Sequence, residues 1–325
     1  MTNRSRRARI VRREPMRPDG SAIGGAVPFG GLPAGHHTRL RAGAYVLTSE
    51  WEHLFSEGKL RTRAVAVAER CGFEHAAFCR TAAAACHGLP VYRMRSDRVD
   101  MIVASRTTRH DGSDVVRHQE PLPAQDVVVI DGLRVTSLDR TVYDVIRTAT
   151  PEAAIAVYDA ALRAVAWDDD TRTYDVAKAE AFRDLVDARI SRGAGARGIR
   201  QARFISEIAD GRAQLPGESV TRLWMLQLGV PAPELQYRID FSDGGFVLLD
   251  FAWPKLGRWM EFDGEAKLTE PEFMGGRTVA EVLADQALRE ERVRQVTGWR
   301  CDRHGFERMP SFEEFAVYLR TIRLR

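Results

Sequence analysis

The feature that most constrains this chain is a short acidic hairpin within residues 246–267. An apolar run at 246–249 has the composition of a β-strand, and Asp250 follows it directly. A Trp-Pro-Lys-Leu-Gly turn then leads to a second short strand that carries Glu261 and Asp263. Because side chains alternate across a strand, these two acids point to one side. The pattern predicts that three carboxylates converge across the hairpin.

Converging carboxylates repel one another unless a cation lies between them. Carboxylate oxygens are hard ligands, so a cluster of this kind suits Mg²⁺ or Mn²⁺. The alternative is a polar strand edge that faces water, where acids at alternate positions cost nothing. The hairpin considered alone leaves both interpretations open.

The segments around the hairpin indicate its place in a larger unit. Upstream, residues 216–219 begin a helix whose apolar positions run to 228, and Gly229 provides a stop. Downstream, an amphipathic segment covers about 279–297, and a strand follows within 298–303. The predicted order is helix, three strands, helix, strand.

This order, with a glutamate on the first helix and acids on the second and third strands, resembles the PD-(D/E)XK nuclease superfamily. Within it, the chain is similar to domains akin to the very-short-patch-repair endonucleases. The resemblance covers about the last third of the chain. Four stretches carry it: Pro216-Gly217-Glu218-Ser219, residues 249–254, Glu261-Phe262-Asp263-Gly264 with Lys267, and 289–292 leading to Trp299 and Arg303. It implies an α-β-β-β-α-β domain that hydrolyses DNA with Mg²⁺.

The resemblance also implies roles for single residues. Asp250 and Glu261 would be the metal-binding pair, and Glu218 an additional metal or water contact. The superfamily's third strand typically reads acid, any residue, lysine, and here Asp263 takes the place of the lysine. Lys267, four positions further on, is then the expected source of an ammonium group in the catalytic set.

Several of these residues have simpler interpretations. The candidates for contact with nucleic-acid phosphates are Arg197, Arg200, Arg203, Arg289 and Arg303. The first three follow a three-residue spacing that predicts one helix face, and the alternative is a solvated linker helix. For Arg289 the alternative is a solvated helix face. Glu218 has the alternative of an exposed pair with Arg222, one helical turn later.

The first half of the chain predicts an α+β domain. Helices are expected at about 60–68 and 74–86, strands at 99–104, 115–118, 127–130 and 133–135, and a capped helix after 136–139. Pieces at 41–46, 86–90, 131–137, 139–144 and 159–163 resemble the antitoxin-like domain of type IV, abortive-infection systems. That resemblance implies phage defence and a partner protein encoded nearby. Family members usually begin with a winged helix-turn-helix, and residues 1–38 show no such helix pair.

Length and charge complete the expected organisation. At 325 residues the chain predicts about two domains. We expect a disordered basic tail at 1–35, an antitoxin-like domain at 36–165, a helical linker at 166–210 and a nuclease-like domain at 211–325. Residues 1–41 carry nine arginines and two acids, although the net charge of the whole chain is only +3. Such an arm predicts salt-sensitive affinity for DNA, and the alternative is an overlong start or a solubilising tail.

The remaining signals concern compartment and metal. No apolar run is long enough to span a bilayer, and no secretory signal is evident, so a cytoplasmic protein is expected. The cysteines fit a reducing compartment. Cys71, Cys79, Cys86 and His87 lack the close pairing of structural zinc sites, which favours buried thiols.

Two hypotheses from different classes follow. The first is a Mg²⁺-dependent endonuclease that acts on DNA, in repair or phage defence. The second is a non-catalytic, antitoxin-like or regulatory module that binds DNA or protein and whose nuclease fold is degenerate. Asp263 in the lysine place favours the second hypothesis, whereas the presence of Glu218, Asp250 and Glu261 together favours the first.

Overall fold

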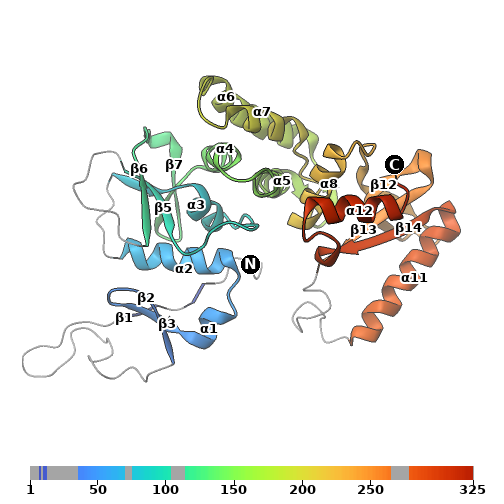
Figure 1. Ribbon diagram of the computed structural model, residues 1–325, viewed down its shortest axis with the longest axis horizontal. Helices are drawn as coiled ribbons and strands as arrows, with labels where there is room; N and C mark the ends of the chain where they lie inside the picture. The colour runs from blue at the N-terminus through green and yellow to red at the C-terminus, as the bar shows by residue number, and fades with distance from the viewer. Residues whose placement is uncertain are drawn as a thin grey trace, which may run out of the picture. The chain divides into compact units, whose positions relative to one another are not determined.

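The computed structural model of the protein describes residues 7–8, 10–12, 36–69, 75–103, 114–264 and 278–324. The protein is a mixed α/β structure (Figure 1). It divides into two compact units, each described by itself below. The N-terminal unit comprises Met1–Val157 and Glu180–Glu207, and the C-terminal unit comprises Tyr158–Ala179 and Ile208–Arg325. The segment 166–210, expected as a separate linker, is thus shared between the two units.

A small antiparallel sheet begins the N-terminal unit. Its strands are β1 (Val11–Arg12), β3 (Ala44–Leu47) and β2 (His37–Arg41), in that order. Ala8 is buried against this sheet, and its backbone N–H donates to Thr62 Oγ1 at 3.1 Å. The paired strand at Val11–Arg12 thus falls within the range that was expected to be a disordered tail. Strand pairing uses backbone groups, which the charged composition of the segment does not reveal.

The main sheet of the N-terminal unit has five strands in the order β6-β5-β4-β8-β7. They are β4 (Ala76–Phe78), β5 (Val99–Val103), β6 (Val115–His118), β7 (Val127–Ile130) and β8 (Leu133–Thr136). β7 and β8 form the predicted hairpin, with Asp131 and Gly132 at φ 49° and 77° as a two-residue turn of this kind requires.

Helices α1 (Thr48–Glu52), α2 (Ser56–Ala68) and α3 (Arg80–Cys86) belong to the same unit. The core packs α2 and α3 onto the main sheet, and the buried alanines of α3 allow close approach. The helix predicted at 74–86 was wrong in its first part, because β4 occupies part of that range. Pairing of β4 with β5 and β8 outweighs the helix propensity of the two alanines in this short Ala-Ala-Phe segment.

Four longer helices follow: α4 (Leu138–Thr148), α5 (Pro151–Ala166), α6 (Val176–Arg192) and α7 (Ile199–Ile208). A short hairpin of two strands, β9 (Trp167–Asp168) and β10 (Thr173–Tyr174), each two residues long, separates α5 from α6. Within the N-terminal unit, Asp126 joins α4 to α6, because it accepts from Arg140 at 3.0 Å and from Arg189 at 2.7 Å. The division between the units falls within α5 and α6.

The C-terminal unit is built on one four-stranded sheet in the order β11-β12-β13-β14. The strands are β11 (Glu234–Asp240), β12 (Phe246–Trp253), β13 (Arg258–Asp263) and β14 (Arg300–Gly305). The first three pair antiparallel, and β14 pairs parallel with β13. Helix α8 (Pro216–Gln227) precedes the strands, α11 (Val279–Thr297) lies between β13 and β14, and α12 (Phe312–Thr321) ends the unit. The expected order of elements is present.

Helices α8 and α12 cover the side of β13 on which Phe262 lies. A Cβ at Gly217 of α8 would come within 1.9 Å of the Phe262 ring, so only glycine permits this contact. His304 and Phe306 stack edge-on against the same ring at 5.4 and 5.0 Å. Because side chains alternate along β13, Glu261 and Asp263 lie on its other side.

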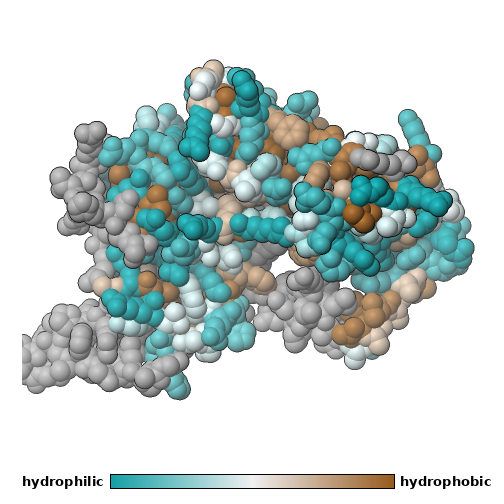
Figure 2. All heavy atoms as spheres, viewed as in Figure 1, coloured by the Kyte–Doolittle hydropathy of each residue, from teal (hydrophilic) through white to brown (hydrophobic). Residues whose placement is uncertain are grey.

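Helix α11 packs on that other side only through part of its length. Val293 is buried in a cluster with Ala252 and Trp259, whereas near the start of the helix Val282 is buried but Val279 and Leu283 are exposed. Figure 2 shows apolar surface at this end of α11. The second half of α11 therefore places its side chains against the acidic side of β13.

Candidate functional site

A row of polar side chains crosses the C-terminal sheet. Its members, called the polar row below, are Gln236, Asp250, Glu261 and Arg303. Phe251 pairs with Met260, and continuing this register by one residue places Asp250 opposite Glu261. Glu261 pairs in turn with Arg303 of β14. Opposite residues on neighbouring strands project to the same face, so the sheet brings the two predicted metal ligands together.

Asp250 is held from both sides. Its Oδ2 accepts the backbone N–H of Phe262 at 3.0 Å, and its Oδ1 accepts from Gln236 Nε2 at 3.3 Å. The sequence had suggested that this strand ends at Asp250. In the structure β12 continues past Asp250 to Trp253. Asp250 is therefore fixed in mid-strand and half-buried, which suits a ligand that must keep one orientation.

Glu261 is buried, with 3% of its surface exposed, and it is paired with an arginine. Arg289 of α11 donates from Nη1 to Oε2 at 3.0 Å and from Nη2 to Oε1 at 3.2 Å. Arg289 Nη2 also donates to the carbonyl of Leu248. This two-pronged contact offsets the charge of Glu261 where the sequence had predicted a metal ion.

Asp263 lies two residues further along β13, at the end of the strand. It accepts from Gln286 Nε2 at 3.4 Å and from Arg303 Nη1 at 3.4 Å to each carboxylate oxygen. Arg303 also donates from Nε to Glu290 Oε2 at 3.5 Å. These contacts are long, so Asp263 and Arg303 are held less firmly than Glu261 and Arg289.

Glu218 caps the start of α8 through its carboxylate. Its two carboxylate oxygens accept the backbone N–H groups of Gln214 at 2.8 Å and Leu215 at 3.1 Å, and only 2% of the residue is exposed. Any metal contact would have to share these oxygens. The alternative of an exposed pair with Arg222 is wrong, because Arg222 pairs with the buried Asp159 at 2.7 Å.

Arg163 of α5 is a neighbour of the acids that the sequence did not single out. Burial lowers the pKa of Arg163, and the carboxylates of Glu218, Asp169 and Asp250 oppose that effect. Its guanidinium stacks over the ring of Trp167 at 4.0 Å. No local pattern relates Arg163 to Asp250, which is far away in sequence.

The remaining predicted residues lie elsewhere. Lys267 lies outside the described residues. Arg200 and Arg203 are exposed on α7 in the N-terminal unit, whereas Arg197 lies in the turn before that helix. The predicted helix face therefore holds two of these three arginines. Arg289 and Arg303 belong to the C-terminal unit and contact the acids themselves.

The site offers fewer metal ligands than the sequence predicted. Among the residues that the structure describes, no three or more His, Cys, Asp or Glu side chains are arranged to hold an ion. The pair Asp250 and Glu261 fits Mg²⁺, which is usually bound by one or two carboxylates with water and substrate phosphate. The two residues supply hard oxygen donors from adjacent strands. Glu261 can bind an ion only when Arg289 no longer donates to its carboxylate.

The cysteines of the N-terminal unit behave as buried thiols, as expected. Cys79 and Cys86 are buried and free, and burial raises the pKa of Cys86 to about 12. His87 contacts the carbonyl oxygen of Thr136 through Nε2 at 2.8 Å. A thiol with so high a pKa stays protonated at neutral pH in the absence of metal. Cys71 lies outside the described residues.

His304, behind the polar row, makes stability depend on pH. Burial lowers its pKa from 6.5 to about 3, and its Nε2 contacts Thr221 Oγ1 at 2.8 Å. Below about pH 6.5 the His304 imidazole is protonated in the unfolded chain but stays neutral in the folded chain. The free energy of unfolding therefore falls as the pH drops below that value. The slope is about 1.4 kcal/mol per pH unit.

Urea unfolding should show His304→Gln losing less stability than wild type between about pH 7 and pH 4. Parallel curves would contradict this assignment.

The pairing of Arg289 with Glu261 gives a second prediction. Arg289→Met leaves a buried carboxylate without its partner and should cost about 2 kcal/mol of unfolding free energy, less than for a fully buried pair because Arg289 is 34% exposed. The double variant Arg289→Met/Glu261→Gln should recover most of the loss. A matched control is Arg294→Met on the same helix, whose pair with Glu291 is exposed. Additive losses in the double variant would show that the two side chains are not coupled.

Comparisons with known proteins find partial relatives. No protein-family model matches the chain, and no solved structure matches it. The chain is 33% identical over 134 residues to the uncharacterized proteins MT2308 and Rv2248, from two strains of Mycobacterium tuberculosis. The match covers 41% of this chain and 44% of each relative, so it spans less than half of either protein. None of the helices in the described part of the chain combines the length and the apolar composition that a membrane span requires.

Proposed function

We propose that the C-terminal unit is a PD-(D/E)XK-like endonuclease domain that hydrolyses DNA with Mg²⁺ or Mn²⁺. The observation that carries the proposal is the register that sets Asp250 opposite Glu261 in the middle of the sheet. Like charges directly opposite each other on neighbouring strands are destabilising, and active sites are places where such pairs are kept. The order of the elements, helix, three strands, helix and strand, agrees with the resemblance.

In this proposal the acids of the site bind the metal ion and the arginines bind the DNA phosphate. Asp250, fixed by the N–H of Phe262, and Glu261 would hold the ion. When bound, the ion supplies Lewis acidity and positive charge for phosphodiester hydrolysis. Arg289 and Arg303 would orient the DNA phosphate, because guanidinium groups bind phosphate in the same forked geometry as carboxylate. A phosphate that attracts Arg289 would also release Glu261.

The test is a cleavage assay with the purified full chain on single-stranded, duplex and mismatched DNA. Cleavage should require Mg²⁺ or Mn²⁺ and stop when a chelator removes the metal. Products from all three substrates, or from one, would support the proposal and would define the form of DNA. Absence of metal-dependent cleavage from every substrate would refute the catalytic function.

A second candidate is a non-catalytic module that binds DNA or a partner protein and whose nuclease-like domain is degenerate. The two-pronged contact of Arg289 with Glu261 favours it, because an internal cation already satisfies the acid. The presence of Asp263 at the usual lysine position favours it as well. The antitoxin-like resemblance of the N-terminal unit adds a protein encoded nearby as a proposed partner. Tight binding of DNA without cleavage, unaffected by metal, would support this candidate over the first.

A further inference from the structure

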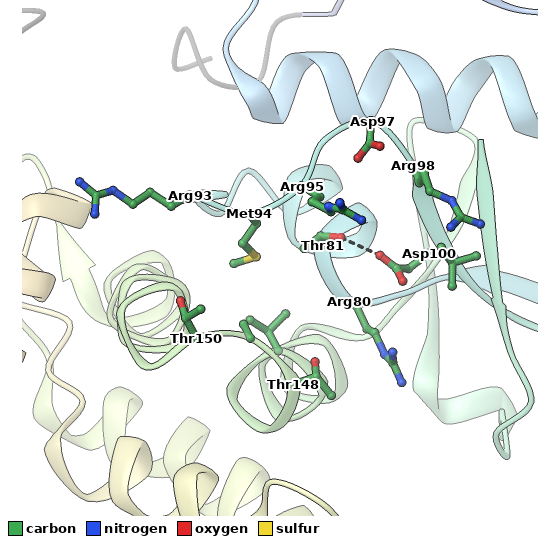
Figure 3. A pocket seen from close by; sticks show the side chains of 13 residues that line it. Arg80, Thr81, Arg93, Met94, Arg95, Asp97, Arg98, Asp100, Thr148 and Thr150 are labelled. Atoms are coloured by element: carbon green, nitrogen blue, oxygen red, sulfur yellow. Dashed lines mark hydrogen bonds between the residues drawn. The ribbon is translucent and has the colours of Figure 1, made fainter. Parts of the chain in front are cut away.

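A cavity in the N-terminal unit is separate from the polar row. It has a volume of about 370 Å³ and lies between the start of α3, the loop at 93–98, strands β5 and β6, and the end of α4 (Figure 3). Its size falls within the range of small-molecule sites, roughly 300–1,000 Å³. All of its lining residues belong to the N-terminal unit.

The lining is rich in positive charge. It includes Arg80, Arg93, Arg95 and Arg98 but only two acids, Asp97 and Asp100. Asp100 is already engaged, since its Oδ2 accepts from Thr81 Oγ1 at 2.8 Å and its Oδ1 contacts His118 Nε2 at 2.7 Å. An excess of cations around a concave surface attracts anions.

Two of these arginines, Arg95 and Arg98, retain hydrogen-bonding capacity. No hydrogen bond or ion pair joins Arg95 to the rest of the described chain. Figure 3 shows its guanidinium directed toward Thr81, while Arg93 extends away from the others. Arg98 donates from Nη2 to the carbonyl of Val115 at 3.0 Å, but its buried Nε lacks a partner among the described residues. A bound oxyanion would satisfy donors of this kind.

The backbone at the cavity is unusual in two places. Arg80 and Arg93 each have a φ of 49°, a left-handed conformation that residues other than glycine seldom adopt. Strained backbone of this kind concentrates at binding sites, where it fixes side chains in position. Arg80 is fixed further by an ion pair with Glu120 at 2.9 Å.

The remaining walls suit a small organic body. Met94, Val116 and Val145 give the cavity apolar surface, and Figure 3 shows Met94 directed toward Thr150. Thr150 adds a hydroxyl group just after α4, whereas the hydroxyl of Thr148 already donates to the carbonyl of Asp144 at 2.7 Å. A ligand that matches both kinds of wall has an anionic head with several oxygens and a compact, less polar body.

We propose that this cavity binds a small phosphate monoester of about mononucleotide size. Arg95 and Arg98 hold the phosphate, the Thr150 hydroxyl donates to the ligand, and Met94 and Val145 contact its body. The proposal goes beyond DNA hydrolysis, because it concerns a different unit and a ligand that is not a substrate of the polar row. It would give the N-terminal unit the means to sense a phosphorylated small molecule.

The test is a calorimetric titration of the full chain with adenosine 5′-monophosphate, inorganic phosphate and adenosine. The monophosphate should bind saturably, phosphate more weakly, and adenosine should not bind at millimolar concentration. Arg95→Ala should weaken binding of the monophosphate about tenfold or more, the usual effect of losing a charged hydrogen-bond donor. The matched control is Arg39→Ala, which removes an exposed arginine on β2 outside the cavity and should leave the affinity unchanged.

The source of the phosphate can be distinguished in the same experiment. A short oligonucleotide with a 5′-phosphate that binds as tightly as the monophosphate, and more tightly than its 5′-hydroxyl form, would assign the site to a nucleic-acid end. Binding of the free monophosphate alone would assign it to a small molecule. Failure of every phosphate-bearing probe to bind at millimolar concentration would overturn the proposal. Equal weakening by Arg39→Ala and Arg95→Ala would also overturn it, since general charge attraction would then explain the binding.

Discussion

Arg222→Met is expected to lower the unfolding free energy of the C-terminal unit by about 3–5 kcal/mol, the usual cost of leaving a buried charge unpaired. Asp159 is fully buried and accepts from Arg222 Nη2 at 2.9 and 2.7 Å. It also accepts the backbone N–H of Asp210 at 2.7 Å. Burial raises the pKa of Asp159, and Arg222 opposes that effect. Removing the arginine therefore leaves a carboxylate that water cannot reach.

The double variant Asp159→Asn/Arg222→Met separates pairing from packing. It removes the unpaired charge but keeps an acceptor for the N–H of Asp210, so it should recover most of the lost stability. The loss in Arg222→Met alone should also shrink as the pH falls, because the folded state then gains a proton on Asp159. Denaturant unfolding of the single and double variants measures both effects. A loss that is as large in the double variant, and independent of pH, would refute the account of this pair.

Local patterns in the sequence were sufficient for much of the C-terminal unit. Helix α11 has the bounds expected from its amphipathic pattern, and α8 begins at the predicted Pro216. The hairpin between β12 and β13 follows from apolar and aromatic residues on either side of a proline-glycine turn. Each of these signals lies within about twenty neighbouring residues, the range over which periodicity is informative.

The partners of the acids could not be predicted in this way. Arg289 reaches Glu261 across 28 positions, and Arg222 reaches Asp159 across 63. Only the folded sheet and the helices packed on it decide which charges meet. The sequence therefore indicated that Asp250 and Glu261 lie together, but not that an arginine holds one of them or that Glu218 caps a helix.

Asp250→Asn should reduce any DNA cleavage by about 100- to 1,000-fold, the size of effect that follows loss of one electrostatic contact at a reacting centre. Asparagine keeps the shape of the side chain and an oxygen for the N–H of Phe262, which lies 3.0 Å from Asp250 Oδ2. Without metal, the variant should therefore be as stable as wild type or slightly more stable, because one of two adjacent negative charges is gone. Asp240→Asn, on the exposed end of β11, is the matched control and should change neither property. Unchanged cleavage in Asp250→Asn would exclude this carboxylate from the reaction.

We propose that Asp250 and Glu261 form a metal site. The most direct test is to measure the melting temperatures of wild type and Asp250→Asn with and without millimolar Mn²⁺ or Mg²⁺. An ion that binds only the folded state raises its stability by mass action. We expect the metal to raise the melting temperature of wild type and of Asp240→Asn, and to leave that of Asp250→Asn unchanged. No rise in wild type, or an equal rise in all three proteins, would contradict the claim.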